Sequence, residues 1–286
     1  MKLQTLVPIL PLPVTLSLQD KVTVLGSCFA DAVGSRLAEW GWDASVNPFG
    51  TLFNPVSVCN SISRLQCGVP FTREDCVEMG AGAGLVCSFS HHTSFARPTP
   101  EAFLENANAV LETASARWKA ASKVLVTLGT AWCWRHEPDG EIVSNCLKRP
   151  SGEFTRERLT VGQTATLLLS LVRRHPDKFF IFTVSPIRHL GGGAHDNQVS
   201  KAILLLALEE VCAAFPDRTA YFPAYEIVLD ELRDYRFYAE DMVHPSSQAA
   251  EYVFEKFLSF AFSDEERSRL EERRKAFKAA QHRPMH

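Results

Sequence analysis

The sequence lacks the features that define several large classes of protein. Its eight cysteines are scattered and form no CxxC pair, which argues against a structural zinc site and against a small disulfide-stapled fold. No apolar run approaches the roughly 18 residues of a membrane-spanning helix. The net charge of −3, from 30 basic and 33 acidic side chains, gives no global attraction for nucleic acid. We therefore expect a globular protein with no nucleic-acid partner and no membrane partner, whose thiols are reduced in the cytoplasm.

Short apolar runs alternate with stripes of helical spacing along the chain. Runs rich in β-branched and aromatic residues predict five strands, at Val22–Leu25, Ala44–Val46, Val124–Leu128, Phe179–Val184 and Ala220–Phe222. Helical stripes lie between them, and Ser200 is interpreted as the N-cap of one helix. This alternation predicts an α/β fold with a central, mostly parallel sheet of about five strands, covered by helices on both faces.

The chain is expected to form one domain over residues 1–262. Residues 51–121 are more than one crossover requires, and they contain the GAGAG run at 80–84. We interpret this segment as an insertion over the sheet edge, with a hairpin of its own, rather than as a second domain. The alternating charges of residues 263–286 predict a helical tail on the surface.

Polar and turn-forming residues gather where the predicted strands end. Ligands bind beyond the carboxyl ends of the strands in an open parallel sheet, so convergence of these segments predicts a site. The segments are residues 26–28 (GSC), 47–50 (NPFG), 129–130 (GT), 185–189 (SPIRH) and, beyond the last strand, 241–245 (DMVHP).

Ser27 lies between a predicted strand and a predicted helix. Gly26 permits a tight turn, and the first turn of the helix offers unpaired N–H groups to a developing oxyanion. A serine nucleophile needs a base, which His244 can supply, and Asp241 can hold the imidazole in the correct tautomer. The alternatives are that Ser27 is only an N-cap and that Asp241 and His244 are ordinary loop residues.

Two further side chains at the predicted rim, Arg188 and His189, are candidates for substrate binding. The forked donors of arginine suit a carboxylate or phosphate, and either residue can bind a sugar hydroxyl. The alternative for Arg188 and His189 is a salt bridge that fixes the loop. Cys28 is expected to be a small buried residue, and a thiol nucleophile at this position is less favoured.

Other candidate ligands are weaker. His91 and His92 are adjacent, and adjacent residues of a strand point to opposite faces, so we expect no metal site. Trp132 and Trp134 flank the loop after the third strand and are candidates to wall a pocket for acyl or sugar groups.

Seven blocks of the sequence, in consistent order, carry a resemblance to a known family. The chain resembles the GSCFA family, named for the motif at residues 26–30, which is similar to the SGNH (GDSL-like) hydrolase superfamily. The blocks are GSCFADAVGSRL (26–37), NPFGTLFNP (47–55), VTLGTAW (126–132), NCLK (145–148), SPIRHL (185–190), HDNQVSKAIL (195–204) and YFPAYEIVLDELRDYRFYAEDMVHPS (221–246). The resemblance implies a three-layer, flavodoxin-like fold and esterase-like activity without a cofactor.

The resemblance also implies roles for individual residues. It makes Ser27 the nucleophile, with Asp241 and His244 as its partners. The oxyanion would be held by the N–H groups of Ser27 and Gly50, with an asparagine in the third block. That position holds Ala131 here, and the resemblance leaves Asn145 or Thr130 as substitutes.

The expected function is a serine hydrolase that cleaves an acyl ester, with acetyl as one candidate, of a small molecule or carbohydrate. Arg188, His189 and Thr130 are the expected substrate contacts. Two alternatives stay open, a module that binds a glycan or small anion without turnover, which Ala131 favours, and an acyltransferase. The oligomeric state is left open.

Overall fold

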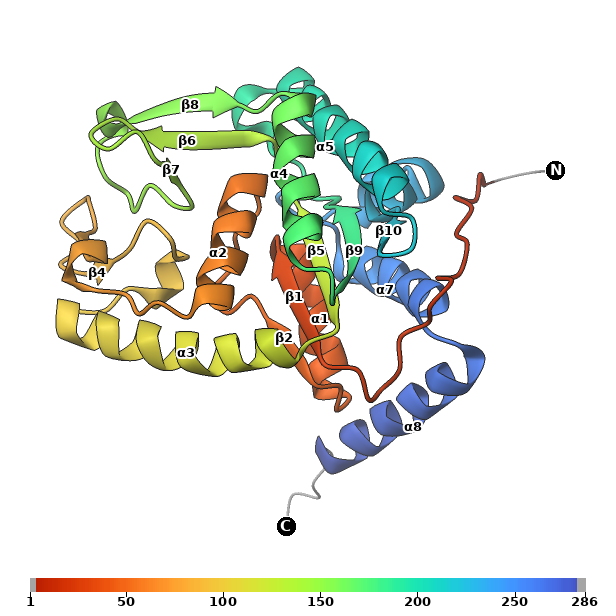
Figure 1. The fold of residues 1–286 in the computed structure, drawn as a ribbon. Coiled ribbons are helices and arrows are strands. Elements are labelled where there is room, and N and C mark those ends of the chain that lie inside the picture. The colour runs from red at the N-terminus through yellow and green to blue at the C-terminus, as the bar shows by residue number, and fades with distance from the viewer. Residues whose placement is uncertain (1–3, 282–286) are drawn as a thin grey trace, which may run out of the picture.

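The computed structural model of the protein describes residues 4–281 and is built around a parallel five-stranded sheet (Figure 1). The strand order is β2–β1–β5–β9–β10, the flavodoxin-like order, and all four pairings are parallel. The strands are β1 (Val22–Gly26), β2 (Ala44–Val46), β5 (Lys123–Leu128), β9 (Phe179–Val184) and β10 (Thr219–Phe222). The predicted fold class is confirmed, and each predicted strand lies within an observed one.

Helices cover both faces of the sheet and make three layers. The long helices are α1 (Cys28–Glu39), α2 (Pro55–Cys67), α3 (Pro100–Ala120), α4 (Val161–Arg174), α5 (Ala194–Ala214), α7 (Ser247–Ala261) and α8 (Asp264–Gln281). Shorter helical segments are η1 (Arg73–Asp75), η2 (Thr93–Phe95), η3 (Ser151–Glu153), η4 (Leu190–Gly192), α6 (Ala224–Glu226), the π-helix η5 (Ile227–Leu232) and η6 (Tyr235–Phe237).

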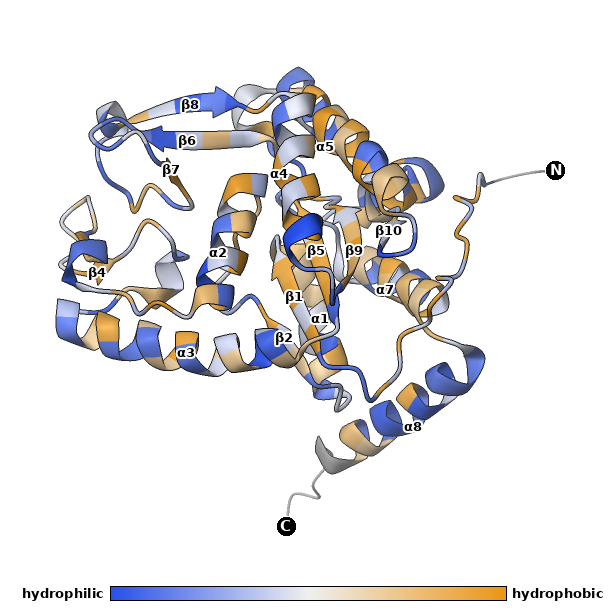
Figure 2. Ribbon diagram, in the orientation of Figure 1, coloured by the Kyte–Doolittle hydropathy of each residue, from blue (hydrophilic) through white to orange (hydrophobic). Residues whose placement is uncertain are grey.

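Two apolar clusters, one on each face, hold the layers together. Alternate residues of a strand point to opposite faces, so Val124 and Val126 pack with α2–α5 whereas Leu125 packs with α1 and α7. Figure 2 shows the apolar strands at the centre and a largely hydrophilic α8 at the outside. The observed α8 covers most of the predicted tail, and residues 1–3 and 282–286 lie outside the described residues.

Helix α5 begins earlier than its sequence indicates. It starts at Ala194, so Ser200 is an interior residue, and its interpretation as an N-cap is wrong. The Ser200 hydroxyl instead accepts a hydrogen bond from the N–H of Ala131 (2.7 Å). A serine side chain that binds a neighbouring loop looks the same in sequence as one that caps its own helix.

Two additions extend the central domain on the same side in Figure 1. Residues 51–121 contain α2, α3 and a short antiparallel pair, β3 (Val77–Glu78) and β4 (Val86–Cys87). A second addition, between β5 and α4, was not expected from the sequence. It is an antiparallel sheet in the order β7–β6–β8, formed by β6 (Trp132–His136), β7 (Ile142–Val143) and β8 (Phe154–Arg158). Within the part of the chain that the structure describes, no helix has both the length and the apolar character needed to cross a membrane.

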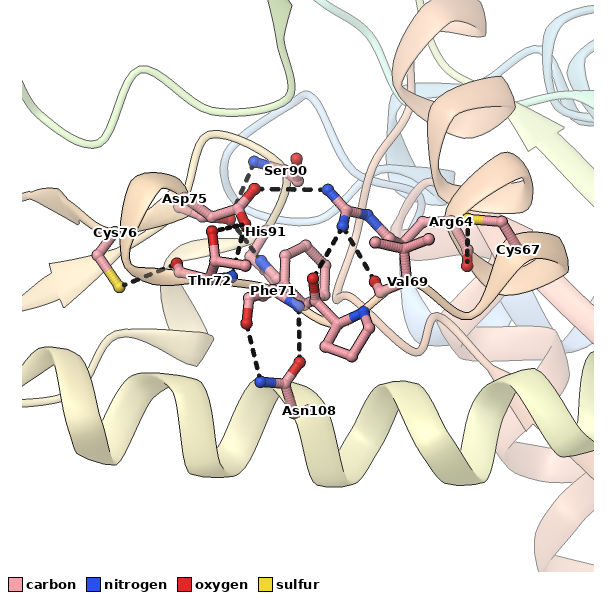
Figure 3. A network of polar contacts seen from close by, with 12 residues as sticks. Arg64, Cys67, Val69, Phe71, Thr72, Asp75, Cys76, Ser90, His91 and Asn108 are labelled. Carbon is pink, nitrogen blue, oxygen red and sulfur yellow. Dashed lines mark hydrogen bonds and ion pairs between the residues drawn. The ribbon is translucent and has the colours of Figure 1, made fainter.

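A cavity of about 560 Å³ lies between α2 and the two small sheets. One wall is tied by Arg64, which donates to the Val69 carbonyl (3.0 Å), approaches Asp75 (3.4 Å) and lies over the Phe71 ring (Figure 3). Asn108 pins the same segment, because its amide exchanges two hydrogen bonds with the Phe71 backbone. These contacts fix residues 69–75 against α2 and α3.

His91 is buried in the core of this addition rather than placed as a metal ligand. Its ring packs against four phenylalanines, Phe49, Phe71, Phe95 and Phe103. Its Nδ1 shares a 2.6 Å hydrogen bond with the Ser88 hydroxyl, and its Nε2 has no partner. Burial, aided by the charge of Arg64, lowers the pKa of His91 to about 3. The ring is therefore neutral, and residues 4–281 contain no cluster of three or more metal-ligating side chains.

We predict that acid destabilises the protein through His91. The pKa of His91 is about 3 in the folded state and has its ordinary value of 6.5 in the unfolded chain, so between these values only the unfolded chain binds the proton. The free energy of unfolding should therefore fall by up to about 1.4 kcal/mol for each pH unit below 6.5. In the double variant Ser88→Ala/His91→Phe, an aromatic ring remains and no orphaned hydroxyl is left. Between about pH 7 and about pH 4.5, the free energy of unfolding measured with urea should fall by about 2 kcal/mol less in the double variant than in wild type.

The control is His195→Gln, because His195 is exposed and should leave the acid sensitivity unchanged. Equal losses of stability in wild type and in the double variant would show that His91 is not responsible.

Candidate active site

Ser27 is held at the end of β1 by a close approach of two backbones. Gly26 has φ +133°, and a Cβ built there would lie 2.0 Å from the carbonyl oxygen of Thr127 on β5. Only glycine allows this contact. The next N–H, that of Ser27, donates to the same oxygen (3.1 Å). Ser27 is the N-cap of α1, its Oγ accepts from the Phe29 N–H (3.2 Å), and the residue is 2% exposed.

A network of three side chains ties the loop after β2 to Ser27. Asn47 accepts from the Gly26 N–H (2.8 Å) and donates to Asp31 of α1 (2.6 Å). The other carboxylate oxygen of Asp31 accepts from the Thr51 hydroxyl (2.7 Å). Sequence reasoning did not single out Asp31, because an acidic residue in the first turn of a helix has an ordinary explanation in the helix dipole.

Asp241 and His244 form the pair that their spacing predicts. The His244 Nδ1 lies 2.7 Å from one Asp241 oxygen, and the other oxygen accepts from the backbone N–H groups of Val243 (2.9 Å) and His244 (3.0 Å). These hydrogen bonds lower the pKa of Asp241 to about 2, so it is a carboxylate at neutral pH. We assign the Nδ1 proton to the bond with Asp241, which leaves Nε2 of His244 as a free acceptor.

The loop that carries this pair lies against the end of β9. The N–H of Arg188 donates to the carbonyl of Val243 (3.0 Å). Strand β9 is two positions from β1 in the sheet, and Ser27 and His244 share no hydrogen bond in this structure. The His244 and Asp241 side chains are 46% and 50% exposed. Ser27, Asp241 and His244 therefore all lie beyond the carboxyl ends of the parallel strands. Of the three, only Asp241 and His244 are hydrogen-bonded to each other.

The backbone donors expected to hold an oxyanion are engaged elsewhere. The N–H of Gly50 donates to the Asn47 carbonyl (2.7 Å) and that of Ser27 to Thr127. The N–H of Cys28, the first residue of α1, makes no hydrogen bond within residues 4–281 and is the unengaged donor beside Ser27. Ala131 is fully buried in an apolar cluster and offers no side-chain donor.

The expectation that Cys28 is buried is wrong. It is exposed, because the first residue of α1 points away from the sheet. Partial burial of the thiol and the nearby charge of Asp31 raise the pKa of Cys28, so the thiol form is favoured. This disfavours Cys28 as the nucleophile.

Five of the sequence-predicted residues line one cavity of about 450 Å³, namely Thr130, Trp132, Trp134, Asn145 and His189. The Thr130 hydroxyl also bonds Ser200 (2.9 Å), and the side-chain amide oxygen of Asn145 accepts from the Leu147 N–H. Ser27, Gly50, Arg188 and the Asp241–His244 pair lie outside this lining. The cavity lining is completed by Phe53, Asn54, Val143, Ser144, Cys146, Arg156 and Gly191.

His189 forms part of the floor of this cavity. Its ring packs on Phe53 (5.2 Å between centroids), and a Cβ at Gly129 would lie 3.0 Å from its Nε2. That nitrogen is buried and has no partner. Burial, with the charges of Lys201 and His244, lowers the pKa of His189 to about 4. His189 is therefore a neutral imidazole whose unsatisfied nitrogen lies against Gly129.

Lys201, which sequence reasoning missed, connects the ends of β5 and β9. It is 1% exposed, and its Nζ donates to the carbonyls of Gly129 and Ser185 (2.6 Å each). Burial and the nearby Arg188 lower the pKa of Lys201 well below its ordinary value. Its sequence signal was a lysine inside the apolar stripe of α5, beside Ile203 and Leu204.

Arg188 has no carboxylate partner among the described residues. Its Nε is buried without a hydrogen bond, and no ion pair involves its guanidinium group. The structure therefore gives no support to the alternative of a loop-fixing salt bridge.

The fold and the position of the candidate residues define a three-layer α/β protein whose candidate site lies beyond the carboxyl ends of a parallel sheet. The GSCFA family model matches residues 21–257, which include all of these residues. The chain therefore belongs to the GSCFA family. None of the curated proteins matches it.

We predict that Gly26 is required for stability and not only for activity. Gly26→Ala should lower the free energy of unfolding by at least about 2 kcal/mol, because the new Cβ would overlap the Thr127 carbonyl at a φ that L-residues avoid. The matched control is Gly162→Ala in α4, where nothing lies within 4 Å of the new methyl group. The control should be neutral or more stable by up to about 1 kcal/mol in urea unfolding. Equal stability of the two variants would refute the proposed close approach.

Proposed function

We propose that the protein is an SGNH-like serine hydrolase that cleaves an acyl ester of a small molecule or carbohydrate. The observation that carries the proposal is the Asp241–His244 pair. Its carboxylate is held in the ionised form, and its imidazole keeps one nitrogen free. Like Ser27, the pair lies beyond the carboxyl ends of the parallel strands. Ser27 is the N-cap of α1 and directly follows β1. A serine, an imidazole and an orienting carboxylate are the groups that acyl transfer requires.

In the proposed reaction the Ser27 Oγ attacks the ester carbonyl carbon while His244 Nε2 accepts the hydroxyl proton. Asp241 stabilises the imidazolium that forms. The tetrahedral intermediate collapses, the C–O bond to the alcohol breaks, and His244 returns the proton to the leaving oxygen. Water then attacks the acyl-Ser27 ester with His244 again as base, which releases the acid and restores the serine.

The oxyanion is proposed to accept first from the N–H of Cys28, which has no other partner. The N–H groups of Ser27 and Gly50 contribute when they exchange their backbone acceptors for the oxyanion. Asn145 and Thr130 stay the candidate side-chain donors, because both line the neighbouring cavity. Loss of one such donor costs about 10²–10³ in rate, so an incomplete set predicts slow turnover of simple esters.

Bond formation between Ser27 and His244 requires the loop at residues 238–246 to move toward β1. Residues of this loop are exposed or half-buried, and its contacts include internal ones, such as the hydrogen bond from the Ala239 N–H to the His244 carbonyl (2.8 Å). Catalytic hydrogen bonds are often long before substrate binds and shorten in the complex. We propose that substrate binding brings His244 to the serine.

Two substrate contacts are proposed at the β9 side of the site. Arg188 has a guanidinium group without an anionic partner, and His189 has a buried nitrogen without a hydrogen bond. Both would gain partners from an oxygen-rich substrate. We also propose a reducing location, the cytoplasm, because all eight cysteines are free.

A second candidate function is a binding module on the same fold. The burial of Ser27 and the engagement of two expected donors favour it. An acyltransferase differs from the hydrolase only in that an alcohol, rather than water, attacks the acyl-Ser27 ester.

A serine-directed fluorophosphonate should label the wild-type protein at Ser27, because the probe needs a serine activated by a base. Ser27→Ala should abolish the labelling, and His244→Ala should slow it by about 10³-fold or more. Intact mass and peptide mapping measure both. The matched control is Ser35→Ala, an exposed serine on the same helix, which should label like wild type.

Labelling that survives in Ser27→Ala would exclude Ser27 as the nucleophile. A wild-type protein that binds glycans but takes no label would be a binding module. With an ester substrate, new ester formed from an added alcohol would identify a transferase.

A further inference from the structure

The antiparallel sheet β6–β8 forms one wall of the 450 Å³ cavity, and this wall is aromatic. Trp132 and Trp134 are two positions apart on β6, so they lie on the same face of the strand. Both line the cavity. No step of the proposed hydrolysis uses either residue.

Trp134 presents an open indole. It is 42% exposed, although large aromatic side chains are generally covered in the absence of a ligand. Its opposite residue on β8 is Arg156, and its opposite residue on β7 is Val143. The backbone of Trp134 is therefore fixed by strand pairing on both sides.

Trp132 is fixed and carries a buried donor without a partner. The guanidinium group of Arg156 lies 3.7 Å from its ring centroid, and Arg156 is itself held by Asp196 (3.4 Å). The Trp132 Nε1–H is buried and makes no hydrogen bond. A buried donor without an acceptor is unfavourable, and a ligand oxygen would satisfy it.

Polar groups face this aromatic wall around the cavity. Thr130, Ser144, Asn145 and His189 contribute a mixture of hydroxyl, amide and imidazole groups to the lining. A purely aliphatic acyl chain would satisfy the indole but would offer no partner to the Ser144 hydroxyl or to the Asn145 amide N–H groups. A sugar ring matches both features, because its C–H face packs on an indole and its hydroxyls bind amides and hydroxyls.

We propose that this cavity is the binding subsite for a pyranose ring, stacked on Trp134 and hydrogen-bonded by Trp132 and the polar lining. The inference rests on the proposed function in one respect, that the sugar is the alcohol part of the ester. Binding itself does not require turnover. The sheet β6–β8 then serves to recognise the substrate, while the central sheet carries the chemistry.

The test uses the full chain with Ser27→Ala, so that no ester is turned over. The probes are the methyl β-glycosides of glucose, galactose, N-acetylglucosamine and glucuronic acid, and methyl α-mannoside, with adenosine as an aromatic competitor. Saturation-transfer NMR and tryptophan fluorescence measure binding. At least one glycoside should bind saturably, with the strongest transfer to its ring C–H protons. In the Ser27→Ala protein, a second substitution Trp134→Ala should weaken binding of the glycoside by about tenfold or more. Trp134→Phe should weaken it by less.

The matched control is Leu206→Ala, which removes another exposed apolar side chain, on α5 and outside the cavity lining. The Ser27→Ala protein with Leu206→Ala should bind the glycoside with the same affinity as Ser27→Ala alone. Binding of no glycoside, binding of adenosine alone, or equal affinity in Trp134→Ala would overturn the inference. Sugar binding without Ser27-dependent ester cleavage in wild type would remove the proposed function and leave the subsite. Ester cleavage without sugar binding would remove the proposed subsite and leave the proposed function.

Discussion

The contact between the Gly26 backbone and the Thr127 carbonyl is the constraint on which the candidate site depends. It brings the ends of β1 and β5 closer than a residue with a Cβ would allow, and the following N–H, that of Ser27, bonds the same oxygen. Ser27 is thereby fixed at the start of α1. Asn47 then connects Gly26 to α1 through Asp31, so the loop after β2 is held beside the serine. One glycine thus determines where the nucleophile of the proposed reaction lies.

The other half of the site is organised around a buried amino group. Lys201 holds the carbonyls at the ends of β5 and β9, which offsets part of the cost of burying its Nζ. The segment after β9 then places His189 over Gly129 and lets Arg188 anchor the loop of Asp241 and His244. The site therefore consists of a serine half on β1 and a base half beside β9. The proposed chemistry requires the two halves to meet.

Local features of the site could be predicted from the sequence, and features that depend on distant partners could not. The strands are continuous apolar runs, and Asp241 and His244 are close enough in sequence for one turn to pair them. By contrast, the sequence shows Lys201 only as one lysine in an apolar helix. Its role could not be predicted, because its acceptor carbonyls lie about 70 and 16 residues away in sequence. The sheet β6–β8 was missed because its two longer strands mix aromatic with charged residues and show no continuous apolar run. The engagement of the Gly50 N–H was also open to sequence reasoning, because Asn, Pro and Gly at the first, second and fourth positions of residues 47–50 favour a turn in which the fourth N–H bonds the first carbonyl.

The central claim is that Ser27 and His244 act together, and a crystal structure of the phosphonylated protein tests it most directly. A phosphonate bonded to a serine imitates the tetrahedral intermediate of acyl transfer. The account predicts a bond from phosphorus to the Ser27 Oγ, with His244 Nε2 about 3 Å from an oxygen bonded to phosphorus. An adduct on another residue, or an adduct on Ser27 with the His244 ring still apart from it and beside Arg188, would contradict the account.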